Sequence, residues 1–279
     1  MKTFITHIRE TTGYLLAILL IFSFSACKQQ KSSDTQSQDE AASEMMEGKD
    51  DVIKEVSDYP LPTSFEVTTL LIEAGASYIL DLCNRVDNVD RYINLKSKAL
   101  NLGVYGADLS YAATYKQTQE TMQYLDASAK LIDELQIGSF DENLVEKVEA
   151  NIDNVDSLIT LISDSFYRTY EYLTTNEQDE LSILVMAGSW IEALFITTQI
   201  SIISADNTEI VEIINEQSTS LDKLLEIMVP VSESEQTSEV FKGLVVLQEI
   251  YRSAEGDLSE ENLESLILKT ESLRNKIIS

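Results

Sequence analysis

The chain has 279 residues, of which 48 are acidic and 20 are basic, so its formal net charge at neutral pH is −28. This acidity excludes binding to nucleic acid through phosphates, which needs clustered Lys and Arg side chains, and leaves cationic partners, divalent ions or simple solubility. The one histidine is His7, so the chain beyond it can form no Ser-His-Asp or Cys-His pair, no histidine-ligated zinc site and no Glu-x-x-His di-iron site.

An uncharged stretch near the N-terminus, residues 14–27 (YLLAILLIFSFSAC), ends on one of the two cysteines of the chain. Lys2 and Arg9 precede it and give the leader a basic start. Its apolar run, residues 14–24, has the length of a secretory signal core. It is too short to cross a bilayer, which takes about 20 apolar residues.

The end of this stretch resembles the lipobox of bacterial lipoproteins, with small Ser25 and Ala26 directly before Cys27. Phe24 departs from the pattern, because an aliphatic residue is commonest there. In lipoproteins the cysteine is acylated, with chains such as palmitate, and becomes the first residue of the mature protein. The resemblance implies that residues 1–26 are a signal peptide and that Cys27 anchors the protein to a membrane. The alternatives are an ordinary secretory signal cut near Cys27 and a short membrane anchor.

The residues after Cys27 bear on where such a lipoprotein would reside. Lys28 and Gln29 follow it, and no aspartate or acidic cluster comes directly after. In lipoprotein families such signals influence sorting between membranes and faces. We therefore expect an envelope protein that faces the periplasm, with exposure on the cell surface as the alternative. After loss of residues 1–26 the chain keeps 18 of 20 basic and 47 of 48 acidic residues, a net charge of −29.

A change of composition divides the remaining chain into a tether and a domain. Residues 27–58 hold the cysteine and a flexible acidic tether rich in Gln, Ser, Asp, Glu and Lys. Pro60 and Pro62 mark the start of the second part, residues 59–279, which we expect to form an all-helical extracytoplasmic domain. About 220 residues can bury a sufficient core. Cys83 is the remaining thiol, so no intramolecular disulfide is expected, and we assign it to the core.

The domain is predicted to be all-α because start signals for helices recur along it. A side-chain acceptor followed three residues later by an acid is the capping box. It occurs at Thr63/Glu66, Ser139/Glu142, Asn176/Asp179, Asp206/Glu209, Ser232/Glu235 and Asp257/Glu260. With Asp108 as a further start, and with Gly103 and Gly138 as C-terminal caps, the predicted helices are 64–102, 108–136, 140–174, 177–204, 207–229, 233–254 and 258–277.

A weak internal repeat suggests how about seven long antiparallel helices are arranged. Residues 89–95 (VDRYINL) match 155–161 (VDSLITL), and a further shift of 66 residues reaches 221–227 (LDKLLEI). A period of about 66 suits a hairpin of two long helices. Three hairpins and a closing helix predict either a helical bundle or a short α-array. The repeated Asp90, Asp156 and Asp222 are solvated flanking residues or, alternatively, a shared binding stripe.

Two tyrosine clusters are the first candidate binding surface. They fall near the first two predicted hairpin turns and consist of Tyr105, Tyr111 and Tyr115 in one cluster and Tyr167, Tyr170 and Tyr172 in the other. The 66-residue period would place both clusters at the same end of the molecule. Tyrosine offers rigid amphipathic contact area, which suits recognition of a protein or a glycan. The alternative is that these rings pack helix ends and keep their hydroxyl groups in water.

Glu192 is the second candidate, because it is the one charged residue between Glu180 and Asp206. The helix around it is apolar on nearly every side and should be central to the bundle, and its polar residues argue against a membrane span. An isolated buried carboxylate must find a cation, collect hydrogen bonds or take up a proton. Arg168 and Lys130 are the expected partners. The alternatives are an exposed edge of the helix and a ligand or catalytic role.

The sequence therefore predicts a membrane-anchored helical lipoprotein that binds or scaffolds a protein or glycan of the cell envelope, with no cofactor and no metal site. Residues 153–156 do not have the spacing of a calcium loop. The alternative function is a carbohydrate-active enzyme that needs no histidine and works with paired carboxylates. A deep cleft with two convergent carboxylates would favour the enzyme, and an open tyrosine-lined face would favour binding.

Overall fold

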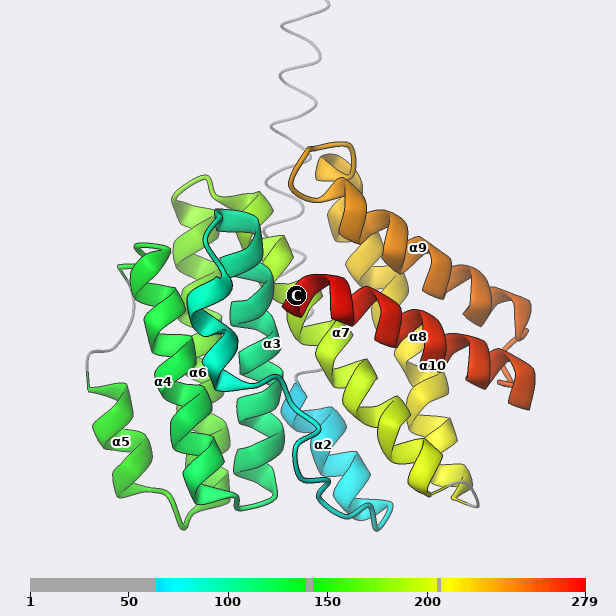
Figure 1. Ribbon diagram of the computed structural model, residues 1–279, viewed down its shortest axis with the longest axis horizontal. Coiled ribbons are helices and arrows are strands. Elements are labelled where there is room, and N and C mark those ends of the chain that lie inside the picture. Colours follow the sequence, from blue (N-terminus) through cyan, green and yellow to red (C-terminus); the bar gives the residue numbers. More distant parts are fainter. Residues whose placement is uncertain (1–63, 139–142, 205–206) are drawn as a thin grey trace, which may run out of the picture. The chain divides into compact units, whose positions relative to one another are not determined.

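The computed structural model describes residues 64–138, 143–204 and 207–279, and within them every regular element is a helix (Figure 1). The all-α prediction is confirmed. Seven of the described helices have at least 16 residues: α3 (Leu95–Thr114), α4 (Thr118–Glu134), α6 (Val155–Thr175), α7 (Asp179–Ile203), α8 (Thr208–Met228), α9 (Ser238–Ser253) and α10 (Glu260–Ile278).

Shorter helices complete the described part: α2 (Ser64–Glu73), α5 (Leu144–Ala150) and the 3-10 helices η1 (Val86–Arg91) and η2 (Val229–Val231). The lipobox-like segment, Cys27 and the tether lie outside the described residues. So do three predicted capping residues, Thr63, Ser139 and Asp206.

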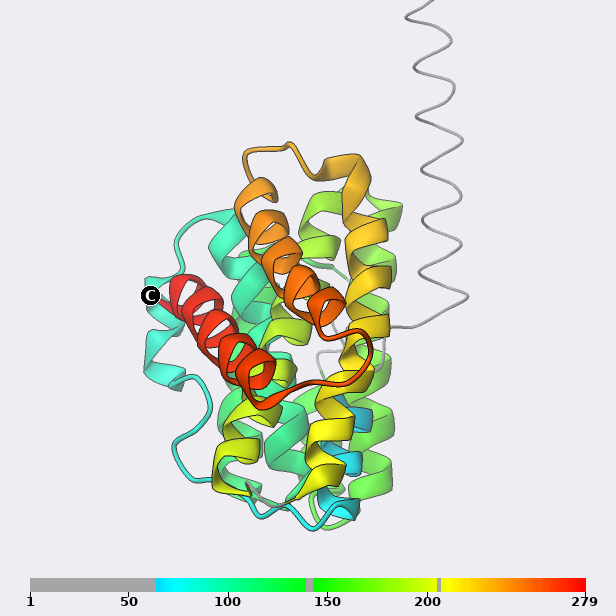
Figure 2. The same cartoon turned by 90° about the vertical axis from the view of Figure 1, so that its right-hand side faces the viewer.

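The long helices form a closed bundle around the central pair α3 and α7 (Figure 1). Hairpins α3–α4, α6–α7 and α8–α9 follow one another, and α10 closes the domain. α3 contacts α2, α4 and α6 as well as α7, and α7 also contacts α8 and α10. Figure 2 shows α9 and α10 slanting across the bundle, with α9 beside α8 and α10 beside α9. The predicted order of hairpins and closing helix is therefore present.

α7 is the core helix that its sequence predicts. By length and composition it is the one helix in the described ranges that qualifies as a candidate membrane span, but 94% of its apolar window is buried inside the protein. Burial on all sides explains why its apolar residues show no single stripe. The surrounding helices therefore cover the apolar side chains of α7.

The predicted boundaries agree to within two residues for α7, α8 and α10 and fail for the first two helices. The expected helix 140–174 is divided into α5 and α6, and α9 begins at Ser238, so the predicted cap at Ser232 is wrong. The expected helix 64–102 is interrupted after α2, and α3 runs through Gly103 without ending there. Gly103 serves close packing, because a β-carbon at this position would lie 2.0 Å from the carbonyl oxygen of Val185 on α7. The side chains that cap helices are Asn94, Asn154, Asn207 and Ser259, so the predicted caps at Asn176 and Asp257 are wrong by two residues.

Three helices end in the same tight turn, although none of them has glycine at the left-handed position. Lys116, Gln136 and Glu177 have φ values of 59°, 57° and 59°. In each turn the next amide donates to the carbonyl oxygen five residues earlier, as Gln178 does to Leu173 at 2.8 Å. This is the Schellman motif, in which glycine is the usual residue at the left-handed position.

The 66-residue repeat does not correspond to equivalent structure. Its three copies lie across η1 and the start of α3, in the first turns of α6, and within α8. The features that do recur have a shorter spacing: the caps Asn94 and Asn154 are 60 residues apart, and the turns at Lys116 and Glu177 are 61 apart. Asp90, Asp156 and Asp222 are exposed at non-equivalent positions and form no stripe.

Candidate functional site

The centre of the bundle holds a cluster of buried polar side chains that we call the polar centre: Cys83, Asn84, Asp108, Glu192 and Arg274. Glu192 comes from α7 and Arg274 from α10. The guanidinium group donates two parallel hydrogen bonds to the carboxylate, from Nε to Oε2 at 2.9 Å and from Nη2 to Oε1 at 2.8 Å. Glu192 is 0% exposed and Arg274 is 7% exposed, so water hardly screens this pair.

The Glu192 prediction was right about the helix and wrong about the partner. Glu192 is buried and not at an exposed edge of α7. Lys130 instead pairs with Asp90 at the surface, and Arg168 lies exposed on α6. The ion pair with Arg274 is of the kind that fixes the register of packed helices.

The guanidinium group also lies over an aromatic ring, with Cζ of Arg274 at 4.2 Å from the ring centroid of Phe195. Stacking of this kind is favourable where water is excluded. Burial is the largest effect and lowers the pKa of Arg274, but the charge and hydrogen bonds of Glu192, together with the charges of Asp108 and Cys83, raise it above its ordinary value. The guanidinium therefore stays charged within the protein.

Asp108 on α3 is a second carboxyl group in the polar centre and is 0% exposed. Its Oδ2 accepts a hydrogen bond from the backbone N–H of Asn84 at 3.1 Å, while Oδ1 has no hydrogen-bond partner among the described residues. Burial, followed by the charge of Glu192, raises the pKa of Asp108 well above its usual range, against the opposing effect of Arg274. Burial at this position therefore disfavours the charged form of Asp108.

Cys83 lies next to this carboxyl group and confirms the prediction of a core cysteine, at 8% exposure. It belongs to the segment between α2 and η1 and not to a helix as expected. Burial and the negative charges of Asp108 and Glu192 raise the pKa of the thiol well above its usual range. Because the thiolate is the reactive form, this environment makes Cys83 a poor nucleophile.

Amide and phenol groups tie the end of α10 to the polar centre. Asn84 Nδ2 donates to the hydroxyl oxygen of Tyr92 at 2.9 Å. Asn101 Nδ2 donates to the carbonyl oxygen of Ile277 at 2.9 Å, and the Tyr92 hydroxyl donates to that of Ile278 at 3.5 Å. Carbonyl groups in the last turn of a helix lack partners within it. α10 is therefore held both at Arg274 and at its C-terminal end.

The first tyrosine cluster does not form a recognition surface. Tyr105 and Tyr111 are fully buried, and their hydroxyl groups bond to backbone: Tyr105 donates to Arg85 O and Tyr111 accepts from Ile79 N, each at 2.9 Å. Tyr111 also stacks on Tyr78 with ring centroids 4.7 Å apart. These rings fix the 76–94 segment against α3.

The three tyrosines of the second cluster differ in how far they are exposed. Tyr167 is 53% exposed, while Tyr170 and Tyr172 are partly buried, and Tyr172 donates to Gln136 O at 3.3 Å. Tyr115 of the first cluster is likewise partly buried and donates to Ala76 O at 2.8 Å. The six tyrosines therefore share no open face. Most of them pack within the bundle, but four of their hydroxyl groups bond to backbone atoms, whereas the alternative kept these groups in water.

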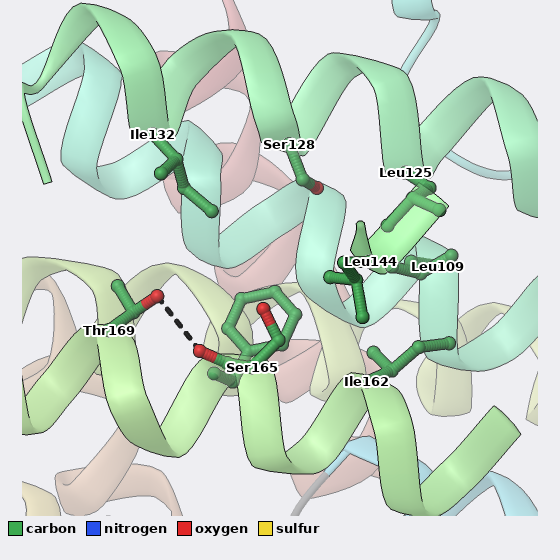
Figure 3. Close-up of a pocket in the computed structure, with 9 residues that line it drawn as sticks. Leu109, Leu125, Ser128, Ile132, Leu144, Ile162, Ser165 and Thr169 are labelled. Carbon is green, nitrogen blue, oxygen red and sulfur yellow. Dashed lines mark hydrogen bonds between the residues drawn. The ribbon is translucent and has the colours of Figure 1, made fainter. Parts of the chain in front are cut away.

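A small cavity lies between α3, α4, α5 and α6 (Figure 3). Its walls are mostly apolar, with Ser128, Ser165 and Thr169 as the polar contributors. The cavity has about the room that one water molecule needs, so it is no pocket for an organic ligand.

Within 64–138, 143–204 and 207–279, no group of three or more His, Cys, Asp or Glu side chains is placed to hold a metal ion. Asp108 and Glu192 are carboxyl groups that lie near one another in the polar centre, and both are closed off from solvent.

Sequence reasoning missed the partners of Glu192. Asp108 was assigned to a helix start, yet it lies in mid-helix among Gly and Ala residues, a pattern that signals close packing around a buried group. Arg274 carried no local signal, because it stands 82 residues from Glu192 within a charged amphipathic helix. Comparisons of the chain with protein-family models, with curated proteins and with solved structures found no match.

Proposed function

We propose that this protein is a lipid-anchored, extracytoplasmic lipoprotein whose helical body binds or scaffolds another component of the cell envelope. The anchor would be Cys27, at the end of the lipobox-like stretch. One acyl chain holds a protein only marginally, so a multiply acylated cysteine suits stable attachment. A tether of about 30 residues would give the body reach of about 30 Å from the membrane.

The main observation in favour of the binding role is that the polar centre is closed off from solvent. Its two carboxyl groups, Asp108 and Glu192, are 0% exposed, and both oxygens of Glu192 are bonded to Arg274. A glycoside hydrolase needs both carboxyl groups to face the sugar. The polar residues of this body instead hold helices together, which supports a rigid scaffold over the paired-carboxylate enzyme.

The charge of the chain indicates the chemistry of the partner. At a net charge of −28, long-range attraction favours a cationic protein surface or a glycan that carries amino groups. Such attraction is screened over about 8 Å at physiological salt, so association should slow as salt rises.

The anchor is tested by labelling cells with a radioactive or clickable fatty acid and separating membranes. The full chain should incorporate label and sediment with membranes, and Cys27→Ser should do neither. Cys83→Ser is the matched control because it removes the other cysteine and should keep both properties. Label in Cys27→Ser, or its retention in membranes, would refute lipidation at Cys27.

The binding role is tested by crosslinking in intact envelopes followed by capture of the full chain. We expect one or a few envelope components to be captured in a salt-sensitive way. The enzyme alternative predicts release of soluble sugars from envelope glycans, with loss of that activity in Glu192→Gln. Hydrolysis that depends on Glu192 would overturn the scaffold role.

A further inference from the structure

The polar centre contains a seat for a guanidinium group, formed by Glu192 and Phe195. Glu192 accepts two hydrogen bonds from the group, and Phe195 offers its ring face. The side chain that fills the seat, Arg274, comes from α10, the last helix. The seat is thus made by the body of the bundle and filled by a terminal element.

We call the described helices before the 254–259 connection, α2 to α9, the body. α10 packs on the body as an amphipathic helical peptide packs in a groove. Its buried residues lie on one stripe with helical spacing: Leu266, Thr270, Leu273, Arg274 and Ile277. Amphipathic helices that dock into grooves use this pattern of anchors. The hydrogen bonds from Asn101 and Tyr92 fix the end of the helix. α10 is connected to the rest of the chain through residues 254–259 alone.

We propose that the seat is an arginine-recognition site that α10 of a second copy of this chain can fill, so that two copies exchange their last helices. In the exchanged pair every contact of α10 is retained, because the second copy brings the same stripe, the same Arg274 and the same C-terminal turn. The change is confined to the 254–259 connection, where Glu255 and Gly256 are exposed and have φ values of 52° and 93°. Exchange of an identical terminal element is a low-cost route to a dimer.

The net charge of the chain determines the conditions under which two copies exchange α10. Two copies at −28 each repel one another, so exchange should increase with salt and with concentration. This salt dependence is opposite to that expected for capture of a cationic partner. Exchange of α10 involves the helical domain alone and does not depend on a lipid anchor.

The test uses two full-length charge reversals, Glu192→Arg and Arg274→Glu. Each variant alone places like charges in its own seat and should be strongly destabilised. In an equal mixture that is unfolded and refolded together, exchange of α10 gives each seat one carboxylate and one guanidinium. We expect a species of twice the monomer mass by light scattering, which melts at least 5 °C above either variant or, where neither folds alone, is the one sample that regains helical signal.

The matched control reverses an ion pair that α10 exchange cannot restore. Lys96 on α3 and Glu239 on α9 are 2.9 Å apart, and both precede the 254–259 connection. A mixture of Lys96→Glu and Glu239→Lys should therefore remain monomeric. The proposal is overturned if the Glu192→Arg and Arg274→Glu mixture behaves as the sum of its two parts, or if the control mixture dimerises equally.

A second variant leaves the seat untouched. Deleting Glu255 and Gly256 shortens the connection, so that α10 can less easily turn back to its own seat. We expect this variant to be a dimer with the helical content of the parent chain. A folded monomer would overturn the proposal, because it would mean that α10 does not leave its own body even when the connection is short.

Discussion

Gly188 on α7 faces the backbone of Leu100 on α3 so closely that a β-carbon on Gly188 would lie 2.0 Å from the Leu100 carbonyl oxygen. Gly103 on α3 meets Val185 O in the same way. The two central helices therefore cross in direct backbone contact, which a residue without a side chain permits. This crossing brings Asp108 and Glu192, one on each helix, into the same buried space.

The first prediction follows from this crossing. Gly188→Ala and Gly103→Ala should each destabilise the protein by about 3 kcal/mol or more, because the β-carbon forces α3 and α7 apart throughout the core. Gly138→Ala is the control, since its β-carbon would lie 3.3 Å from the Tyr172 ring, which can shift. Urea unfolding followed by circular dichroism measures the differences. Equal, small effects at all three positions would contradict the crossing.

The second prediction concerns the buried ion pair. Arg274→Met should lower the free energy of unfolding by about 3–5 kcal/mol, because it leaves Glu192 buried without a cation. Glu192→Gln should be milder, since the amide can still accept from the guanidinium. Changing both residues to similar-sized apolar residues should recover much of the loss in Arg274→Met.

An exposed pair provides the comparison for this cycle. Lys96 and Glu239 have side-chain exposures of 27% and 61%, so Lys96→Met should cost less than about 1 kcal/mol. Thermal melts of the single and double variants measure the coupling. If the stability losses of the Glu192 and Arg274 variants simply add in the double variant, the two residues act independently.

The third prediction is a pH dependence that originates at Asp108. In the unfolded chain this carboxyl group has its ordinary pKa of 3.8, and in the folded protein its pKa is well above that. Above pH 3.8 the unfolded chain releases a proton that the folded protein keeps. The free energy of unfolding should therefore fall by up to about 1.4 kcal/mol per pH unit, until the folded pKa is reached. Below pH 3.8 this stabilisation is fully present.

Asp108→Asn tests this sign. Asparagine keeps an acceptor for the Asn84 N–H and has no proton to lose, although Glu192, Arg274, Cys83 and Tyr124 still face the position. The variant should gain stability relative to the parent chain as pH rises from 4 to 7. Parallel stability curves would mean that Asp108 is ionised in the folded protein as in the unfolded one.

The fold class and the later helices could be predicted because their signals are local. Recurring start signals predicted long helices in this part of the chain, and they placed the starts of α7, α8 and α10 to within two residues. α6 and α9 begin later than expected. The first two predicted helices failed at Gly103, because glycine at a helix end and glycine at a helix crossing look alike in sequence. The helix crossing depends on α7, which lies about 80 residues further along the chain.

The candidate sites failed for a similar reason. Tyr105 and Tyr111 have polar hydroxyl groups that favour a surface, but Arg85 O and Ile79 N bond to them inside the protein. Glu192 was recognisable as an isolated charge within an apolar helix, while its partner was one of many basic residues on amphipathic helices. A local sequence pattern can identify a residue that needs a partner. Which other residue becomes that partner depends on tertiary packing.

The fourth prediction concerns the three helix ends with left-handed residues. Lys116→Gly, Gln136→Gly and Glu177→Gly should each stabilise the protein by about 0.5–1 kcal/mol, because glycine takes up a positive φ without steric cost. The reverse change is the control: Gly75→Ala, at φ of 79° with open space around it, should destabilise by a similar amount. Destabilisation by all three glycine variants would mean that their side chains contribute more than the backbone strain.

The last prediction uses Cys83 to report opening of the polar centre. Cys83 is 8% exposed, and burial and nearby carboxyl groups raise the pKa of its thiol, so a maleimide should find little thiolate to attack. In a Cys27→Ser chain at pH 7, Cys83 should react at least about a hundredfold more slowly than a cysteine introduced at exposed Ser279, measured by mass spectrometry. Arg274→Ala removes the bond that draws α10 onto this region, so it should speed the labelling of Cys83 and leave the Ser279→Cys rate unchanged. Labelling of Cys83 at the Ser279→Cys rate in the parent chain would contradict the closed polar centre, and an unchanged Cys83 rate in a folded Arg274→Ala chain would show that the ion pair does not keep it closed.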